Sequence, residues 1–379
     1  MTAVTLRRRA YFGLALFFCS TLPGADLFQT PVFIASESGY HTFRIPAIVA
    51  TQKGTLLAFA EGRKRGTSDT GDIDLVLKRS LNLGRGWEPL QIVADDGPNT
   101  IGNPCPVLDR STGTVWLPLT RNLGEDSEDE ILARTGKGTR EVWITKSDDD
   151  GVTWSKPIDI TAAVKRAEWT WYATGPGCGI QLSAGRLLIP CDHAVEATQV
   201  RRSHVIFSDD HGATWRLGGV LDDLTNECQA VELADGAVML NMRSYHGKNR
   251  RAVATSKDGG LTWSAVALDD VLIEPVCQAS FLRYSRKTEK KVRSKDRIVF
   301  ANPASTRREK MTVRLSYDEG KTWPVEQVLH EGPSAYSSLV VLASDDIGCL
   351  YERGTKKPYE TITYARFNLR WLTDAKDSP

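Results

Sequence analysis

The chain has 379 residues, of which 41% are hydrophobic and 25% are charged, and its formal net charge is +1. This composition is typical of a globular protein with enough apolar residues to bury a core. A net charge so close to zero argues against nucleic acids or other acidic polymers as partners, because such partners require a clear excess of Lys and Arg.

The first 25 residues have the pattern of an export signal. Three arginines at positions 7 to 9 precede an apolar run from Ala10 to Phe18, and small or turn-forming residues follow up to Ala25. The apolar run is shorter than the ~20 residues that a membrane-spanning helix needs. We therefore expect a signal peptide at 1–25 and a secreted or periplasmic protein, with an uncleaved membrane anchor as the alternative.

An eight-residue pattern, S-x-D-x-G-x-T-W, recurs along the rest of the chain. Its complete copies are Ser147 to Trp154, Ser208 to Trp215, Ser256 to Trp263 and Ser316 to Trp323. A degenerate copy starts at Ser80, with Asn82 and Gly86 in place of the Asp and the Thr. Ser and Asp side chains bond nearby backbone amides, and Gly allows a positive φ, so each copy predicts a β-hairpin turn. The Trp is expected to pack that hairpin onto its neighbours.

The spacing of the copies predicts the fold class. They start at residues 80, 147, 208, 256 and 316. Each interval has room for about four short strands with their loops, which is the content of one propeller blade. Because the repeats run through most of the chain, we expect an all-β protein whose residues 26–379 form a single closed β-propeller.

The repeated unit resembles the Asp box of sialidases (neuraminidases) and of several other propellers. The resemblance implies a six-bladed β-propeller with the boxes at the blade periphery, so the box Asp residues are not expected to take part in chemistry. A more specific match is Phe43-Arg44-Ile45-Pro46, which is similar to the F/Y-R-I-P motif of sialidases. In that family its arginine, here Arg44, binds the carboxylate of the substrate.

Other family motifs follow in chain order. An E-x-R pattern ends at Arg63 and is followed by Asp69 in a Gly- and Asp-rich loop. The resemblance implies that Arg63 lies in the pocket and that Asp69 is the general acid/base, with Asp72 as a rival. Asn103, in a Gly-Asn-Pro turn, is the expected sugar contact on the next blade.

The middle of the chain carries further matches. Trp171 and Tyr172 lie in a segment similar to one that lines the family's pocket, although aromatic residues there could equally belong to the core. Glu227 matches the family's buried glutamate, and Arg243, in N-x-R-S, matches its second carboxylate-binding arginine. The acidic stretch Glu125 to Glu130 reads as a solvated surface insertion.

The last third of the chain contains the remaining family motifs. Arg308 follows an Asn-Pro-Ala turn, as the family's third arginine does, with the adjacent Arg307 as the alternative. Tyr336, in an A-Y-S segment, matches the family's nucleophile, and Glu352, in Y-E, matches the glutamate that steadies the first arginine. The basic run Arg283 to Arg297 reads as an exposed hairpin loop.

The chemistry explains why these residue types are needed. A sialic acid carries an ionised carboxylate on its anomeric carbon, and three guanidinium groups, from Arg44, Arg243 and Arg308, offer it paired charge-assisted donors. A neutral phenol can approach that centre where a carboxylate nucleophile would be repelled. Tyr336 then needs Glu227 as its base, because an ordinary tyrosine pKa is near ~10.

Asp69 is expected to protonate the leaving oxygen and later to activate water. Closure of its loop is predicted to raise the pKa of this carboxyl and to give an acidic optimum. The sequence thus predicts a retaining exo-α-sialidase that acts on sialylated glycans through a covalent sialyl-tyrosine. A non-catalytic glycan-binding propeller and an Asp-box glycosidase for neutral polysaccharides are the alternatives.

No metal, organic cofactor or obligatory protein partner is implied, and a monomer is expected. Six cysteines follow the leader, without a C-x-x-C pair. We expect most of them to be free thiols buried in strands, since a propeller of this size does not need disulfides.

Overall fold

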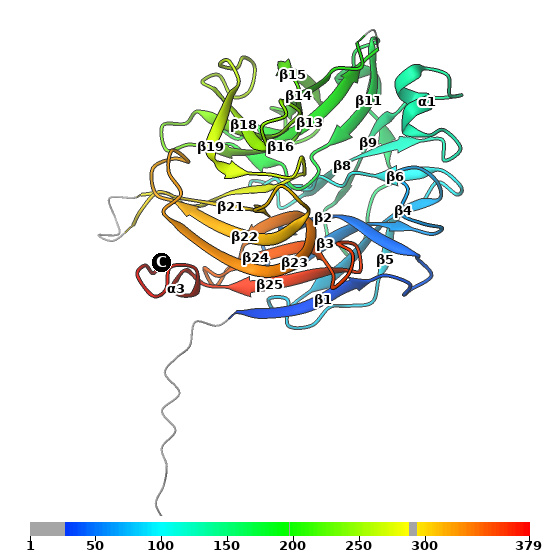
Figure 1. The fold of residues 1–379 in the computed structure, drawn as a ribbon. Coiled ribbons are helices and arrows are strands. Elements are labelled where there is room, and N and C mark those ends of the chain that lie inside the picture. The colour runs from blue at the N-terminus through cyan, green and yellow to red at the C-terminus, as the bar shows by residue number, and fades with distance from the viewer. Residues whose placement is uncertain (1–26, 197, 288–293) are drawn as a thin grey trace, which may run out of the picture.

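The computed structural model describes residues 27–196, 198–287 and 294–379, and the predicted signal peptide at 1–25 lies outside these ranges. Within them the chain forms 25 strands and three short helices. The strands make sheets arranged around a common centre, and all their pairings but one are antiparallel (Figure 1). The prediction of an all-β protein is therefore confirmed.

Hydrogen bonding joins the strands into four sheets of nine, five, four and seven strands, and the nine- and seven-stranded sheets each comprise two neighbouring blades, which makes six blades in all. The first blade contains β2 (Thr42–Ala50), β3 (Leu56–Arg63), β4 (Ile73–Ser80) and β5 (Gln91–Ala94). The second contains β6 (Thr100–Gly102), β7 (Val107–Leu108), β8 (Val115–Asn122), β9 (Glu141–Ser147) and β10 (Ile158–Asp159). The third contains β11 (Trp169–Thr174), β12 (Ile180–Gln181), β13 (Leu187–Val195), β14 (Arg201–Ser208) and β15 (Arg216–Asp223).

The remaining strands form the other three blades. The fourth contains β16 (Thr225–Glu232), β17 (Val238–Ser244), β18 (Arg250–Ser256) and β19 (Ala267–Ile273). The fifth contains β20 (Ser280–Ser285), β21 (Arg297–Pro303), β22 (Glu309–Ser316) and the first half of β23 (Val325–Val341). The sixth contains the second half of β23, β24 (Ile347–Arg353), β25 (Thr361–Phe367) and β1 (Phe28–Ile34). The helices are α1 (Glu128–Ala133), α2 (Thr161–Val164) and α3 (Leu369–Leu372).

Two features join the last blades and close the ring. The 17-residue strand β23 pairs with β22 along its first half and with β24 along its second half, so the fifth and sixth blades share it. The N-terminal strand β1 pairs antiparallel with β25, near the other end of the chain. The first and last parts of the sequence thus complete the same blade, and the predicted six-bladed propeller is confirmed.

Each Asp box forms the turn between the third and fourth strands of its blade. In the first complete copy the Gly151 amide donates to Ser147 Oγ at 2.9 Å, and the Thr153 amide and hydroxyl donate to the Asp149 carboxylate at 2.9 and 2.6 Å. The same bonds recur in the other complete copies. They favour the ionised carboxylate, with the Thr153 hydroxyl first, and lower the pKa of Asp149 to about 2.

The boxes also pack each blade against the preceding one. Gly151 has a φ of 77°, and a Cβ atom at this position would lie 2.7 Å from the side chain of Leu57 in the first blade. Trp154, at the end of the same box, packs edge-on against Phe59 with ring centroids 5.6 Å apart. Glycine is therefore needed here both for the backbone conformation and for the close approach of the blades.

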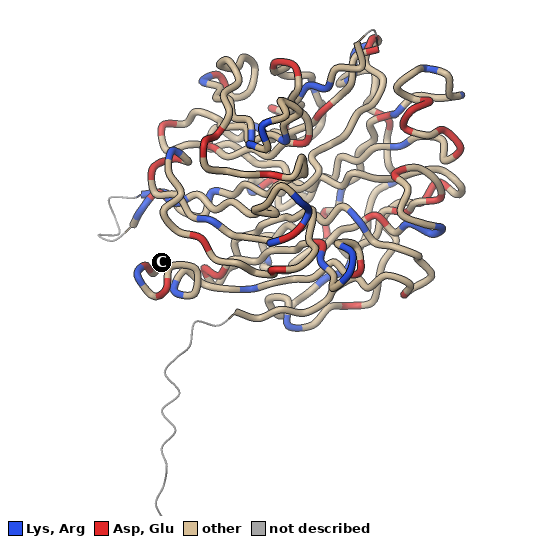
Figure 2. Tube along the Cα trace, in the orientation of Figure 1, with Lys and Arg blue, Asp and Glu red and all other residues tan. Residues whose placement is uncertain are grey.

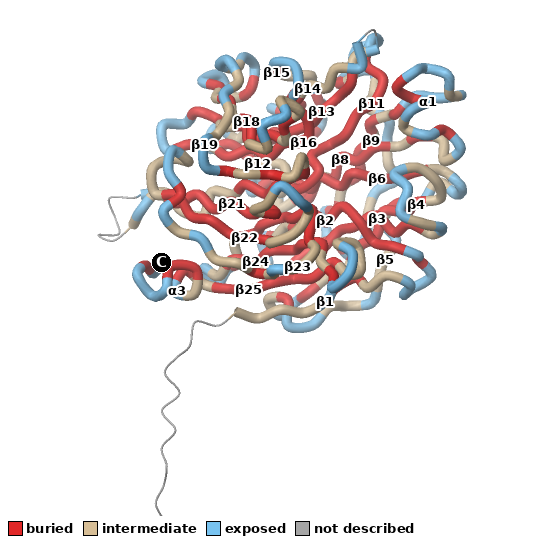
Figure 3. The backbone as a smooth tube through the Cα atoms, viewed as in Figure 1, coloured by how far each residue is buried: buried red, intermediate tan, exposed pale blue. Residues whose placement is uncertain are grey.

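The core consists of the apolar faces between neighbouring sheets, while the connecting loops are exposed (Figure 3). All six described cysteines are free, and five of them are fully buried, as expected. Acidic and basic residues are interspersed around the molecule (Figure 2), which agrees with the low net charge. None of the helices in the described ranges is both long and apolar enough to cross a membrane.

Candidate active site

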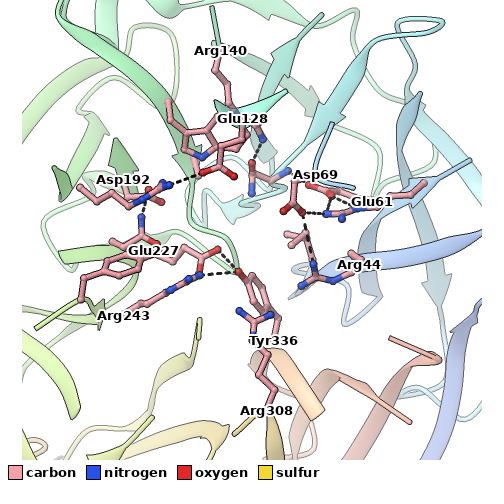
Figure 4. Close-up of a pocket in the computed structure, with 18 residues that line it drawn as sticks. Arg44, Glu61, Asp69, Glu128, Arg140, Asp192, Glu227, Arg243, Arg308 and Tyr336 are labelled. Atoms are coloured by element: carbon pink, nitrogen blue, oxygen red, sulfur yellow. Dashed lines mark hydrogen bonds and ion pairs between the residues drawn. The ribbon is translucent and has the colours of Figure 1, made fainter. Parts of the chain in front are cut away.

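A polar pocket lies near the centre of the ring and receives side chains from every blade (Figure 4). Most of the residues predicted from the sequence line it, and these are Arg44, Arg63, Asp69, Asn103, Trp171, Glu227, Arg243, Arg308 and Tyr336. No residue of an Asp box lines this pocket. Side chains two residues apart on a strand point to the same face. Glu61 and Arg63, at the polar end of the otherwise apolar strand β3, therefore both face the centre.

Tyr336, Glu227 and Arg243 form a hydrogen-bonded group on one side of the pocket. Tyr336 Oη donates to Glu227 Oε1 at 2.6 Å, and Arg243 Nη1 donates to Glu227 Oε2 at 2.8 Å and to Tyr336 Oη at 3.3 Å. Burial and the negative charge of Glu227 raise the pKa of Tyr336 well above its ordinary value. The phenol is therefore neutral at ordinary pH, with a carboxylate in place to accept its proton.

Glu352 lies behind the pocket and is completely buried. Its carboxylate accepts from Arg44 Nε at 2.9 Å and Nη2 at 3.3 Å, and also from the backbone amides of Ile45 and Tyr336, both at 3.0 Å. One carboxylate thus fixes the side chain of Arg44 and the backbone that carries Tyr336. This contact joins the first and the last blade.

Arg308, and not Arg307, enters the pocket. Arg308 Nη1 donates to Tyr359 Oη at 2.7 Å, and its guanidinium lies 5.6 Å from the centroid of the Tyr336 ring. The side chain of Arg307 is 79% exposed and pairs with Glu309 at 3.0 Å. The two neighbours diverge because the tight turn before β22 sends successive side chains in opposite directions.

Asp69 stands at the mouth of the pocket with 53% of its side chain exposed. Its Oδ1 accepts from Arg63 Nη2 at 2.6 Å and lies 3.7 Å from Arg44 Nη1. Burial acts to raise the pKa of Asp69, but the positive charges of Arg63 and Arg44 outweigh it and hold the pKa below its ordinary value. Two arginines from separate strands reach the same oxygen here, and the upward shift expected on closure of the loop over the sugar stays a prediction.

Asp72, the rival of Asp69, points elsewhere. Its carboxylate pairs with Lys64 Nζ at 2.8 Å and does not line the pocket. The Lys64 ammonium also lies 3.1 Å from Asp74, so Asp72 belongs to a charged cluster on the far side of the loop.

Trp171 lines the pocket, whereas Tyr172 does not. The ring of Tyr172 is completely buried and packs against Trp169 and His204 in the core of the third blade. An irregularity in the pairing of β11 with β13, between Trp169 and Tyr172, brings these two rings to the same face and turns Trp171 to the other. The prediction that Tyr172 contacts substrate is corrected accordingly.

Asn103 links the pocket to a buried arginine that the sequence analysis did not single out. The backbone amide of Asn103 donates to Glu61 Oε1 at 2.9 Å, and the side-chain oxygen of Asn103 accepts from Arg140 Nη2. Arg140 is buried and its guanidinium lies 3.9 Å from the centroid of the Trp171 ring. The turn at Asn103 is thus held in place from two sides.

Further residues line the pocket although no family motif in the sequence indicated them. Glu128 pairs with Arg201 at 2.6 Å, and Asn226 Nδ2 donates to Asp192 Oδ1 at 2.6 Å. Burial, assisted by Glu227, raises the pKa of Asp192 well above its ordinary value.

Glu128 shows that the acidic stretch at 125–130 is not simply a solvated insertion. Ser127 and Glu130 form a capping box that starts α1, and this short helix aims Glu128 at the pocket. The S-x-x-E spacing was the signal that could have revealed the helix.

The arrangement can bind a carboxylate, take up a proton from a phenol and exchange a second proton at its mouth. Three guanidinium groups face the same space, Glu227 is bonded to Tyr336, and Asp69 reaches solvent. Among the described residues, no group of three or more His, Cys, Asp and Glu side chains could hold a metal ion.

Comparison with known proteins identifies the family. Residues 54–349 match the model of the BNR repeat-like domain. The chain is 35% identical to an exo-alpha-sialidase of Arthroderma benhamiae, over 96% of this chain and 91% of that protein. It is 34% identical to a sialidase of Micromonospora viridifaciens over 92% of this chain, which spans about half (55%) of that longer protein.

A solved structure agrees with these relatives. The Hadza microbial sialidase Hz136 superposes with a TM-score of 0.83 at 33% identity, covering 91% of this chain and 69% of that one. The family match covers most of the propeller, and the relatives match it nearly from end to end. The chain is therefore a glycoside hydrolase that belongs to the exo-α-sialidase family.

Proposed function

We propose that this protein removes terminal α-linked sialic acids from glycoproteins, glycolipids or oligosaccharides with retention of configuration, through a covalent sialyl-tyrosine intermediate on Tyr336. The observation that carries the proposal is the 2.6 Å hydrogen bond from Tyr336 to Glu227 in a pocket shared with three arginines. Every group given a role comes from one chain, so we propose that a monomer without cofactor suffices. The export signal remains a prediction from the sequence.

Binding begins with the carboxylate of the sugar. Arg44, Arg243 and Arg308 reach the pocket from the first, fourth and fifth blades, so they can surround an anion from different directions. Hydrogen bonds between guanidinium and carboxylate are charge-assisted and about twice as strong as neutral ones. The clamp would set the anomeric carbon next to Tyr336.

In the first step Tyr336 Oη attacks the anomeric carbon while the glycosidic bond breaks. The phenol proton passes to Glu227, and the proton on Asp69 passes to the leaving oxygen. A phenol is neutral as it approaches, so the substrate carboxylate does not repel it as it would a carboxylate nucleophile. The products of this step are a sialyl-tyrosine and a free alcohol.

In the second step water attacks the same carbon from the side that the alcohol left. Asp69, now ionised, takes a proton from the water, and Glu227 returns its proton to the departing Tyr336 oxygen. Two displacements at one carbon restore the original configuration, and both catalytic carboxyl groups return to their starting protonation states.

The two alternatives explain less of the site. A glycan-binding propeller would need the arginines but not the Tyr336–Glu227 pair or a titrating group at the mouth. A glycosidase for neutral polysaccharides would have no use for three convergent guanidinium groups.

Proton NMR of the hydrolysis of methylumbelliferyl α-sialoside tests the proposal directly. We expect the α anomer of the free sugar to appear first and to convert slowly to the more stable form. If the β anomer appears first, the covalent intermediate is excluded. If folded protein releases no sugar at all, the glycan-binding propeller becomes the better description.

An Asp69→Asn variant is expected to lower kcat on a natural sialoside by about 10²-fold, and to affect the aryl sialoside less, because that leaving group needs little proton donation. The acid form of Asp69 is required and its pKa is lowered. For wild type, kcat/KM on the natural substrate should therefore fall as the pH rises from about 4 to 8. The measurement is a pH profile with both substrates.

Asp72→Asn is the matched control, since this carboxylate lies in the same loop but pairs with Lys64. It should leave both profiles close to wild type. A profile flat over the same pH range, or equal losses in the two variants, would contradict the role proposed for Asp69.

A further inference from the structure

Tyr359 contacts two of the three clamp arginines, although no motif pointed to it. It lies in the hairpin between β24 and β25 and is half-buried. Its Oη accepts from Arg308 Nη1 at 2.7 Å, and the guanidinium of Arg44 lies 4.0 Å from the centroid of its ring. The first contact is a hydrogen bond to a cation and the second is a cation–π contact.

The partners of the three arginines differ in charge. Arg44 is paired with the carboxylate of Glu352 and lies 3.7 Å from that of Asp69, and Arg243 is paired with Glu227. Among the ion pairs of the described residues none involves Arg308, and its hydrogen bond goes to the hydroxyl of Tyr359. The positive charge of Arg308 therefore remains uncompensated, which suits a ligand with one negative charge.

The hairpin that carries Tyr359 is held in a defined shape. The Glu360 carboxylate accepts from the backbone amides of Thr355, Lys356 and Lys357 at 2.8 to 2.9 Å. The Glu360 carbonyl also accepts from the amide of Ala35 at 3.0 Å. The ring of Tyr359 is thus fixed relative to the clamp by its own loop and by the segment that follows β1.

We propose that Tyr359 is a positioning residue that orients Arg308 and covers Arg44 without adding a negative charge, so that the guanidinium of Arg308 keeps its positive charge for the substrate carboxylate. This inference rests on the proposed function, because it assumes that the clamp binds a sialic acid carboxylate. A carboxylate at position 359 would attract the guanidinium of Arg308 but would cancel its charge. A phenyl ring would keep the contact with Arg44 but lose the hydrogen bond.

Two substitutions separate orientation from charge. Tyr359→Phe is expected to raise KM on methylumbelliferyl α-sialoside, and the Kd of free sialic acid by calorimetry, by about tenfold, the usual cost of a hydrogen bond to a charged group. Because the carboxylate is bound in both the ground state and the transition state, kcat should change much less than KM. Tyr359→Glu is expected to raise both constants further, by about 100-fold, since a carboxylate there would cancel the charge of Arg308.

Tyr284→Phe is the matched control, because it removes a phenol bonded to the Asp345 carbonyl at 2.8 Å on another blade. It should leave KM and Kd unchanged. Equal constants for Tyr359→Phe and wild type, or a Tyr359→Glu variant no worse than Tyr359→Phe, would overturn the inference.

Thermal unfolding of each variant shows whether the comparison is between folded proteins, and residue 359 lies in a half-exposed turn that a substitution should not unfold. Lack of turnover in wild type would instead contradict the proposed function. In that case binding of sialic acid still tests Tyr359 independently.

Discussion

A Tyr336→Phe variant should lose turnover of α-sialosides, with kcat reduced by about 10³-fold or more, because the nucleophilic oxygen is absent. The ring, its burial and the backbone bond from the Tyr336 amide to Glu352 all remain, so the propeller should fold normally. The measurement is fluorescence release from methylumbelliferyl α-sialoside. Retention of more than about a tenth of wild-type kcat would contradict the assignment.

Tyr351→Phe provides the matched control for this experiment. Tyr351 is a fully buried tyrosine on β24 whose Oη donates to Gln29 Oε1 at 2.8 Å, and it does not line the pocket. It should keep wild-type kcat even if its stability drops. Mass spectrometry after reaction with 2,3-difluorosialic acid then identifies the residue to which the sugar is attached. A label on Glu227 instead of Tyr336 would show that Glu227 is the nucleophile.

A Glu227→Gln variant is expected to lower kcat by about 10³-fold, because an amide cannot accept the phenol proton. Burial and Glu227 itself raise the pKa of Tyr336, so the phenol does not ionise without help. KM should not rise, since Arg243 is released from its 2.8 Å ion pair with Glu227 and becomes fully available to the substrate carboxylate. Steady-state kinetics with the aryl sialoside provide both constants.

Glu232→Gln is the control for this variant. Glu232 lies on the same strand, β16, but pairs with Arg286 at 2.8 Å and does not line the pocket. A loss of kcat no larger in Glu227→Gln than in Glu232→Gln would remove Glu227 from the mechanism.

The repeats made the fold predictable because each Asp box encodes one complete local structure. The side chains of the Ser, Asp and Thr of a box bond within the box, so the turn forms from eight consecutive residues wherever it occurs. Ring closure through β1 and β25 depends on residues at opposite ends of the chain, and no local pattern signals it.

The site was predictable only where a motif fixed a position. Arg44, Arg243 and Tyr336 each lie in a strand but at or beside an irregularity in its pairing, so a motif, and not the period of two along a strand, identified them. Trp171 and Tyr172 could not be separated, because a pairing irregularity in β11 breaks that period. The choice between Arg307 and Arg308 likewise depends on the conformation of one turn.

Interactions between distant segments were invisible in the sequence. The pKa of Asp69 depends on Arg63 and Arg44, which reach it from two strands. Tyr359 lies in a hairpin without periodic pattern, and its significance comes from Arg308 on the neighbouring blade. The roles of such residues can be recognised only when the positions of their partners in the fold are known.

The bond between Arg44 and Glu352 spans 308 residues of sequence, which has a consequence for how the protein is made. During synthesis the first arginine of the clamp leaves the ribosome long before the carboxylate that fixes it. Contacts between such distant residues form late and slowly, because a long loop must first close. A nascent chain that ends before residue 352 lacks both the nucleophile's support and the closed ring, so catalytic competence arises in one step, on completion of the last blade.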